Sequence, residues 1–199
     1  MPYPAFFDLG PRMRMHDPLA EFLGAFEDGI VEYSYIDAVR LAGHSCPTVA
    51  GAYWLTRQAL LALYPDALPE RGGVRVSFRD SQVAGVTGVI ANVVALLTGA
   101  TVDSGFKGLA GRFDRRKLLA FPAGQPFELR FTRIDTGAPV DAAAALRQVP
   151  ADQLLTALRG KGVIVAVVES YGRGAVEGSA FSSGVTAVHH GEGNHEHSE

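Results

Sequence analysis

The sequence contains one cysteine, Cys46, among its 199 residues. A single cysteine excludes an intrachain disulfide and a four-cysteine zinc site, so a disulfide-stapled secreted scaffold does not fit this chain. The first residues lack a basic start, an uninterrupted apolar run and a clear cleavage signature, so we expect no signal peptide. A cytoplasmic location, where thiols stay reduced, is the expectation that follows.

The chain also lacks a large charge of either sign. Its formal net charge is -3, whereas nucleic-acid-binding domains carry a concentrated basic surface, so we expect no nucleic-acid partner. The uncharged stretch 82–102 is interrupted by glycine, threonine and asparagine. Because a membrane-spanning helix needs about 20 mostly apolar residues, this stretch predicts a buried helix, and we expect no membrane partner.

The hydrophobic content of 47% is enough for a folded core, and the length fits one domain with a tail. The last eleven residues, HHGEGNHEHSE, hold four histidines and three glutamates and cannot build a core. We therefore divide the chain into a single domain, residues 1–188, and a disordered tail, residues 189–199. Residues 1–15 are expected to form an irregular arm, because Pro2, Pro4 and Pro11 interrupt regular structure.

Apolar periodicity and capping residues predict the elements of the domain. Asp17 with Pro18 is suited to start one helix, and Pro47 is suited to start another. Helices are expected over residues 19–26, 35–41, 48–63, 86–97, 142–147 and 151–158, and strands over residues 74–78, 118–121, 127–134, 163–168 and, briefly, 185–188. This order lacks a steady β-α-β alternation, which favours an α+β fold with N-terminal helices packed on a mixed or antiparallel sheet.

The sharpest local feature for chemistry is Gly43-His44-Ser45-Cys46-Pro47. A helix that begins at Pro47 places Cys46 at a helix N-terminus, where a thiol ionises more easily and can act as a metal ligand or nucleophile. His44 is two residues away, and His16 is the one other histidine outside the tail. Three such ligands plus water match an open zinc site. The alternatives are an inert buried cysteine with a hydrogen-bonded His44, a surface His16 beside Asp17, and a Cys46 nucleophile with His44 as its base.

Two further groups of residues are candidates for binding. The tail histidines can bind nickel, zinc or copper, or they can belong to a solvated terminus without function; they are His189, His190, His195 and His197. Lys107 and Arg112 lie in a glycine-rich segment that matches neither a Walker loop nor a dinucleotide-binding fingerprint. They are candidates to hold an anionic ligand, the alternative being solvated charges in a turn region.

The segment 42–53 resembles the Gly-His-x-Cys-Pro signature of the formylmethanofuran dehydrogenase E-subunit family, including the later glycine and tyrosine, Gly51 and Tyr53. Residues 84–100, followed by Gly105-Phe106-Lys107-Gly108, are similar to the second block of that family. The resemblance covers about residues 35–121. This chain departs from the family in two ways: alanines, Ala84 and Ala100, stand where the second block often has cysteines, and the C-terminal zinc ribbon is absent.

The resemblance implies an α+β fold similar to the dimeric catalytic-type domain of glyceraldehyde-3-phosphate dehydrogenases. It also implies a metal, zinc or another transition metal, near His44 and Cys46, a homodimer, and an oxidoreductase or other metalloenzyme as a partner. We therefore expect a metal-binding protein whose reaction and substrate the sequence does not name. Two alternatives remain open: an accessory protein that delivers metal through its histidine-rich tail, and haem binding through Cys46 and Pro47.

Overall fold

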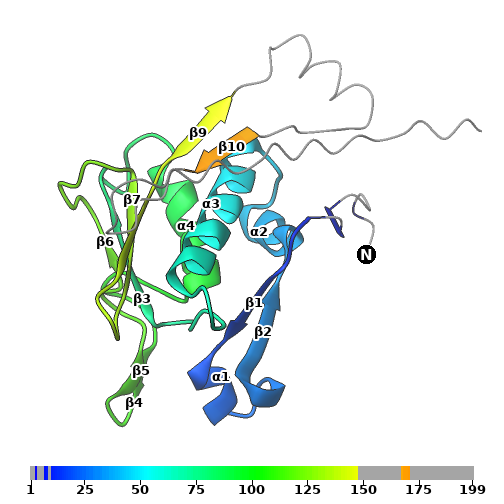
Figure 1. Ribbon diagram of the computed structural model, residues 1–199, viewed down its shortest axis with the longest axis vertical. Coiled ribbons are helices and arrows are strands. Elements are labelled where there is room, and N and C mark those ends of the chain that lie inside the picture. The colour runs from blue at the N-terminus through cyan, green and yellow to red at the C-terminus, as the bar shows by residue number, and fades with distance from the viewer. Residues whose placement is uncertain (1–2, 4–6, 9, 148–166, 171–199) are drawn as a thin grey trace, which may run out of the picture.

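The structure is a computed structural model that describes residues 3, 7–8, 10–147 and 167–170 (Figure 1). Within these ranges the chain has an α+β fold, with four α-helices, a mixed four-stranded sheet and small two-stranded sheets. The helices are α1 (Pro18–Phe22), α2 (Tyr35–Ala42), α3 (Pro47–Leu63) and α4 (Thr87–Thr98), and a 3-10 turn, η2 (Glu27–Gly29), follows α1. The sequence therefore predicts the fold class correctly.

The four-stranded sheet has the strand order β6-β3-β7-β8. Its strands are β3 (Val74–Phe78), β6 (Leu119–Ala120), β7 (Leu129–Arg133) and β8 (Pro139–Ala142). The sheet is mixed because β3 pairs with β6 in parallel and with β7 antiparallel, while β7 and β8 are also antiparallel. Along β3, buried Val74, Val76 and Phe78 alternate with more exposed residues, as expected for a strand with one face on the core.

The core lies between that apolar face and the two longest helices, α3 and α4 (Figure 1). Phe131 of β7 and Leu60 of α3 are fully buried in it, together with Val94 of α4. A second cluster joins the start of α3 to the end of α4 and to Ala38 of α2. Because α3 and α4 are apolar on several sides, each can pack against the sheet and against a neighbouring helix at the same time.

Smaller strand pairs flank this core. Strands β1 (Met13–His16) and β2 (Ile30–Tyr33) form an antiparallel pair, and α1 and η2 lie in the connection between them. Strands β4 (Lys107–Leu109) and β5 (Arg112–Asp114) form a hairpin, and β9 (Ala144–Arg147) pairs antiparallel with β10 (Val167–Ser170). Figure 1 shows α1 and the β4–β5 hairpin at the same end of the molecule.

The predicted elements include the three longest helices and three strands of the four-stranded sheet. Six expected elements are present, and their bounds differ from the expected ones by two residues at most. They are the helices at 35–41, 48–63 and 86–97 and the strands at 74–78, 118–121 and 127–134. Helix α1 is shorter than expected because the chain turns back into β2. The helix expected at 142–147 is wrong, since these residues end β8 and form β9, where pairing with other strands outweighs the helix propensity of alanine.

The strands β1, β2, β4, β5 and β8 are absent from the predicted strands. Part of the arm expected to be irregular, Met13–His16, is strand β1, because Met13 and Met15 insert into the core from alternate positions. The helix expected at 151–158 and the strand expected at 185–188 lie outside the described residues. So does the tail, residues 189–199, while the strand expected at 163–168 is described only from Val167 onward.

Candidate functional site

The loop between α2 and α3 places the two predicted ligands. Gly43 ends α2 with a φ of 75°, a left-handed conformation that glycine adopts without steric cost. Cys46 is the N-cap residue of α3, with an extended φ of -149°, and Pro47 is the first helical residue. The structure therefore places Cys46 at the N-terminus of a 17-residue helix, as the sequence predicts.

The His44 ring is exposed and held through one nitrogen. Its Nδ1 lies 3.0 Å from the carbonyl oxygen of Ala42. A carbonyl oxygen can only accept a hydrogen bond, so Nδ1 carries the proton and the neutral ring keeps the lone pair of Nε2 available. Cys46 is a free, half-buried thiol whose side chain makes no capping hydrogen bond to the helix. Among the described residues, neither Nε2 of His44 nor Sγ of Cys46 has a hydrogen-bond partner.

Tyr35 borders this loop on the side of α2. Its hydroxyl lies 2.8 Å from Oγ of Ser45. Burial raises the pKa of Tyr35, the hydrogen bond with Ser45 lowers it by less, and the nearby Cys46 thiol raises it further. The ring of Tyr35 packs against Tyr53, with centroids 5.8 Å apart. The rings of Tyr35 and Tyr53 therefore form an apolar surface beside the loop, and this surface carries the Tyr35 hydroxyl.

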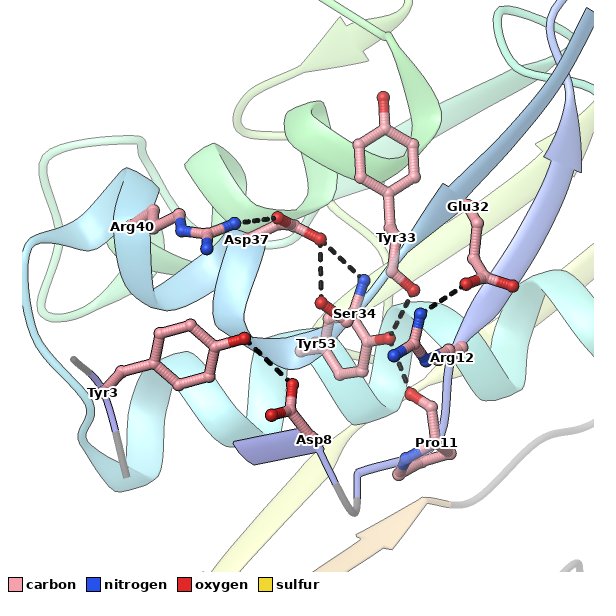
Figure 2. A network of polar contacts seen from close by, with 10 residues as sticks. All are labelled: Tyr3, Asp8, Pro11, Arg12, Glu32, Tyr33, Ser34, Asp37, Arg40 and Tyr53. Atoms are coloured by element: carbon pink, nitrogen blue, oxygen red, sulfur yellow. Dashed lines mark hydrogen bonds and ion pairs between the residues drawn. The ribbon is translucent and has the colours of Figure 1, made fainter. Parts of the chain in front are cut away.

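Tyr53, the tyrosine of the resemblance, ties the N-terminal arm to α3 (Figure 2). Its hydroxyl donates to the carbonyl oxygen of Pro11 at 2.7 Å and lies 3.2 Å from that of Tyr33. Burial raises the pKa of Tyr53 to about 12, so the phenol stays protonated and remains a donor. Tyr53 thus has a structural role next to the candidate site.

The start of α2 is held by its own capping residues, which Figure 2 also shows. The backbone N–H and the hydroxyl of Ser34 both donate to the carboxylate of Asp37, at 2.8 and 2.9 Å. Arg40 donates to the other oxygen of Asp37 at 3.1 Å. These contacts stabilise the first turn of the helix that leads into the His44 loop.

His16 occupies a different setting, at the end of β1. Its Nε2 lies 2.8 Å from the Glu21 carboxylate. With Tyr64, Glu70 and Arg133 it lines a depression of about 330 Å³. Among the residues that the structure describes, no three His, Cys, Asp or Glu side chains gather so that they could hold a metal ion. His16 is therefore not brought into such a group with His44 and Cys46.

The structure does not test the other predicted binding residues. Lys107 and Arg112 are exposed on the β4–β5 hairpin, and the Arg112 guanidinium lies 4.6 Å from the centre of the Phe113 ring. The tail histidines lie outside the described residues. The metal site at His44 and Cys46, the tail sites and the anion site at Lys107 and Arg112 all stay predictions.

Sequence reasoning missed a buried ionic cluster. Asp17, which is 4% exposed, accepts a hydrogen bond from Arg115 at 2.6 Å and from Arg71 at 3.0 Å. Burial by itself raises the pKa of Asp17, but the two guanidinium groups outweigh it and lower that pKa below its usual value. Arg71 also donates to the carbonyl oxygen of Leu96, near the end of α4.

The sequence indicates only one contact of this cluster, the helix cap made by Asp17. Asp17 does cap α1, accepting from the backbone N–H groups of Leu19 and Ala20, as its position before Pro18 predicts. Its ionic partners are 54 and 98 residues away along the chain. No local spacing can indicate a contact over that separation.

Comparisons with known proteins identify no relative: no family model, curated protein or solved structure matches the chain. In the part of the chain that the structure describes, no helix has the length and apolar character to cross a membrane.

Proposed function

We propose that the chain binds zinc or another transition metal through Nε2 of His44 and Sγ of Cys46. The observation that carries this proposal is the contact between His44 Nδ1 and the Ala42 carbonyl oxygen. Metal-binding histidines almost always donate their second ring N–H to a carbonyl or carboxylate, which orients the ring and selects the tautomer. His44 has this arrangement, and its Nε2 makes no hydrogen bond to another described residue.

The chemistry of the two donors supports the proposal. Cys46 is the N-cap residue of α3, and a cysteine binds metal through its sulfur as the thiolate. Thiolate and neutral imidazole are ligands that zinc prefers. Two protein ligands leave further positions for water or a substrate, where a bound metal can polarise an oxygen or lower the pKa of water. The resemblance to the formylmethanofuran dehydrogenase family, the dimeric dehydrogenase-like fold that it implies and a cytoplasmic metalloenzyme partner belong to the same proposal.

The test is the metal content of the purified chain, measured by mass spectrometry. The parent protein for this test has no affinity tag, and alanine replaces the four tail histidines, His189, His190, His195 and His197. Metal bound by the tail therefore does not contribute to the measurement. We expect about one metal ion per chain after supplementation with zinc. His44→Ala and Cys46→Ser should both lose it, whereas His16→Ala should keep it, because His16 is paired with Glu21.

Cobalt gives a second readout. A cobalt-substituted site with a thiolate ligand shows sulfur-to-metal charge-transfer absorption, which Cys46→Ser should abolish. A folded parent protein that binds neither metal would overturn the proposal. Metal bound only when the tail histidines are present would support delivery by the tail, and a Soret band that depends on Cys46 after haem titration would support haem binding.

A further inference from the structure

One end of the molecule exposes large apolar side chains. Residues 21–28, which cover the end of α1 and the start of η2, are all exposed. Within this stretch Phe22 is 60%, Leu23 58% and Phe26 52% exposed. The adjacent β4–β5 region adds Phe106 and Leu109, which are 39% and 42% exposed. We call these five residues the end patch.

Helix α1 and the β4–β5 hairpin are in contact beside these residues. The rings of Phe22 and Phe113 have centroids 5.5 Å apart, and the Arg112 guanidinium lies 5.9 Å from the Phe22 ring centre. Phe113 has a φ of 64°, which is costly for a bulky residue. The fold thus accepts backbone strain at the residue that joins the hairpin to α1.

The apolar area of the end patch indicates that another surface covers it. A phenylalanine side chain offers roughly 150–250 Å². At the exposed fractions given above, the three phenylalanines of the end patch alone leave roughly 230–380 Å² of aromatic surface open to water. The largest apolar patch on a typical monomer is about 300–600 Å² and is often functional, and the two leucines extend this one further.

The charges around the end patch differ between its two parts. Glu27 and Asp28 lie on the α1 side, and Lys107 and Arg112 lie on the hairpin side. All four are exposed, and none of them is ion-paired with another residue of the described ranges. The patch therefore has an apolar centre, an acidic side and a basic side.

We propose that the end patch is the interface through which two copies of this chain associate around a two-fold axis. In such an interface the same surface of each copy faces the other, so the surface must be complementary to itself. A two-fold rotation brings the basic side of one copy against the acidic side of the other, with the apolar centres in contact. The carboxylates of Glu27 and Asp28 disfavour an anionic membrane as the occupant. The proposal assigns an interface to the homodimer that the resemblance implies, and it does not require metal binding.

Charge reversal in the full chain tests the proposal, with mass measured by sedimentation velocity across a concentration series. The wild-type chain should form dimers. Arg112→Glu and Glu27→Lys should each weaken association by ~10-fold or more, because like charges then meet across the axis. An equimolar mixture of the two variants should recover association as a heterodimer, since both contacts then join opposite charges.

Apolar substitutions complete the test. Phe26→Ser should weaken the dimer, whereas the matched control Val83→Ser should not, because Val83 is 93% exposed but lies outside the end patch. A monomeric wild-type chain, a dimer that neither charge variant weakens, or a mixture that fails to recover association would each overturn the proposal. Binding of a monomeric wild-type chain to anionic vesicles, lost in Phe26→Ser, would assign the patch to a membrane instead.

Discussion

Replacement of Asp17 by alanine should destabilise the protein far more than the loss of an exposed carboxylate. The side chain is 94% buried and accepts hydrogen bonds from two guanidinium groups and from two backbone N–H groups of α1. Its removal leaves Arg115, of which only 5% is exposed, without its carboxylate partner. It also leaves the first turn of α1 without a cap.

The magnitude follows from these contacts. Removing one partner of a buried ion pair costs about 3–5 kcal/mol, because the remaining charge stays buried without compensation. Loss of a helix cap costs about 0.5–2 kcal/mol, but one carboxylate makes both kinds of contact, so the two losses do not add fully. We expect Asp17→Ala to lower the free energy of unfolding by about 3–5 kcal/mol. A domain of this kind has about 5–15 kcal/mol in total.

Urea unfolding followed by circular dichroism measures the effect. With a slope of about 2 kcal/mol per molar urea, the midpoint should fall by roughly 1.5–2.5 M. Asp17→Asn keeps an oxygen to cap α1 but loses the charge, so most of the destabilisation should remain. Asp135→Ala is the matched control: its carboxylate pairs with Arg133 but is 59% exposed, so the midpoint should fall far less than in Asp17→Ala.

The pH dependence of unfolding gives an independent check. The pKa of Asp17 is lower in the folded than in the unfolded protein, so its stabilising contribution is present above the unfolded pKa of about 3.9 and is lost as pH falls through the folded pKa. The wild-type protein should therefore lose stability on acidification more steeply than Asp17→Asn. If Asp17→Asn matches the wild type in both midpoint and acid dependence, the buried charge is unimportant and the reasoning is refuted.

Three further predictions concern stability. Gly72→Ala should cost more than Gly24→Ala in a thermal melt, because a Cβ at Gly72 would collide with the Arg115 guanidinium whereas one at Gly24 meets nothing within 4 Å; equal losses would contradict a packing role for Gly72. Tyr53→Phe should lose about 1–3 kcal/mol in urea unfolding, since the Pro11 carbonyl loses its donor, and an unchanged midpoint would show that water replaces the hydroxyl. Phe131→Ala should lose about 3–5 kcal/mol in the same assay, because this residue of β7 is fully buried in the core; a loss below about 1 kcal/mol would contradict the described core.

The sequence by itself determined the elements whose signals are local. Pro47 sets the start of α3 because its fixed φ and missing N–H suit the first helical position. The alternation along Val74–Phe78 predicts a strand with one buried face, and both are present in β3. The place of Cys46 at a helix N-terminus follows from Pro47 in the same way. The metal itself cannot be read from these residues, because two neighbouring donors do not define a complete ligand set.

Tertiary structure decided the features that depend on residues far apart in the chain. Residues 144–147 are rich in alanine and suited to a helix, but they form β9 because hydrogen bonds to β10 are available there. Asp17 meets Arg115 across 98 residues, and Phe22 meets Phe113 across a similar separation. Local propensity contributes only fractions of a kcal/mol per residue, whereas strand pairing, burial of charge and aromatic packing contribute more. The physical reason is that these larger contributions exist only once the chain has folded and brought the partners together.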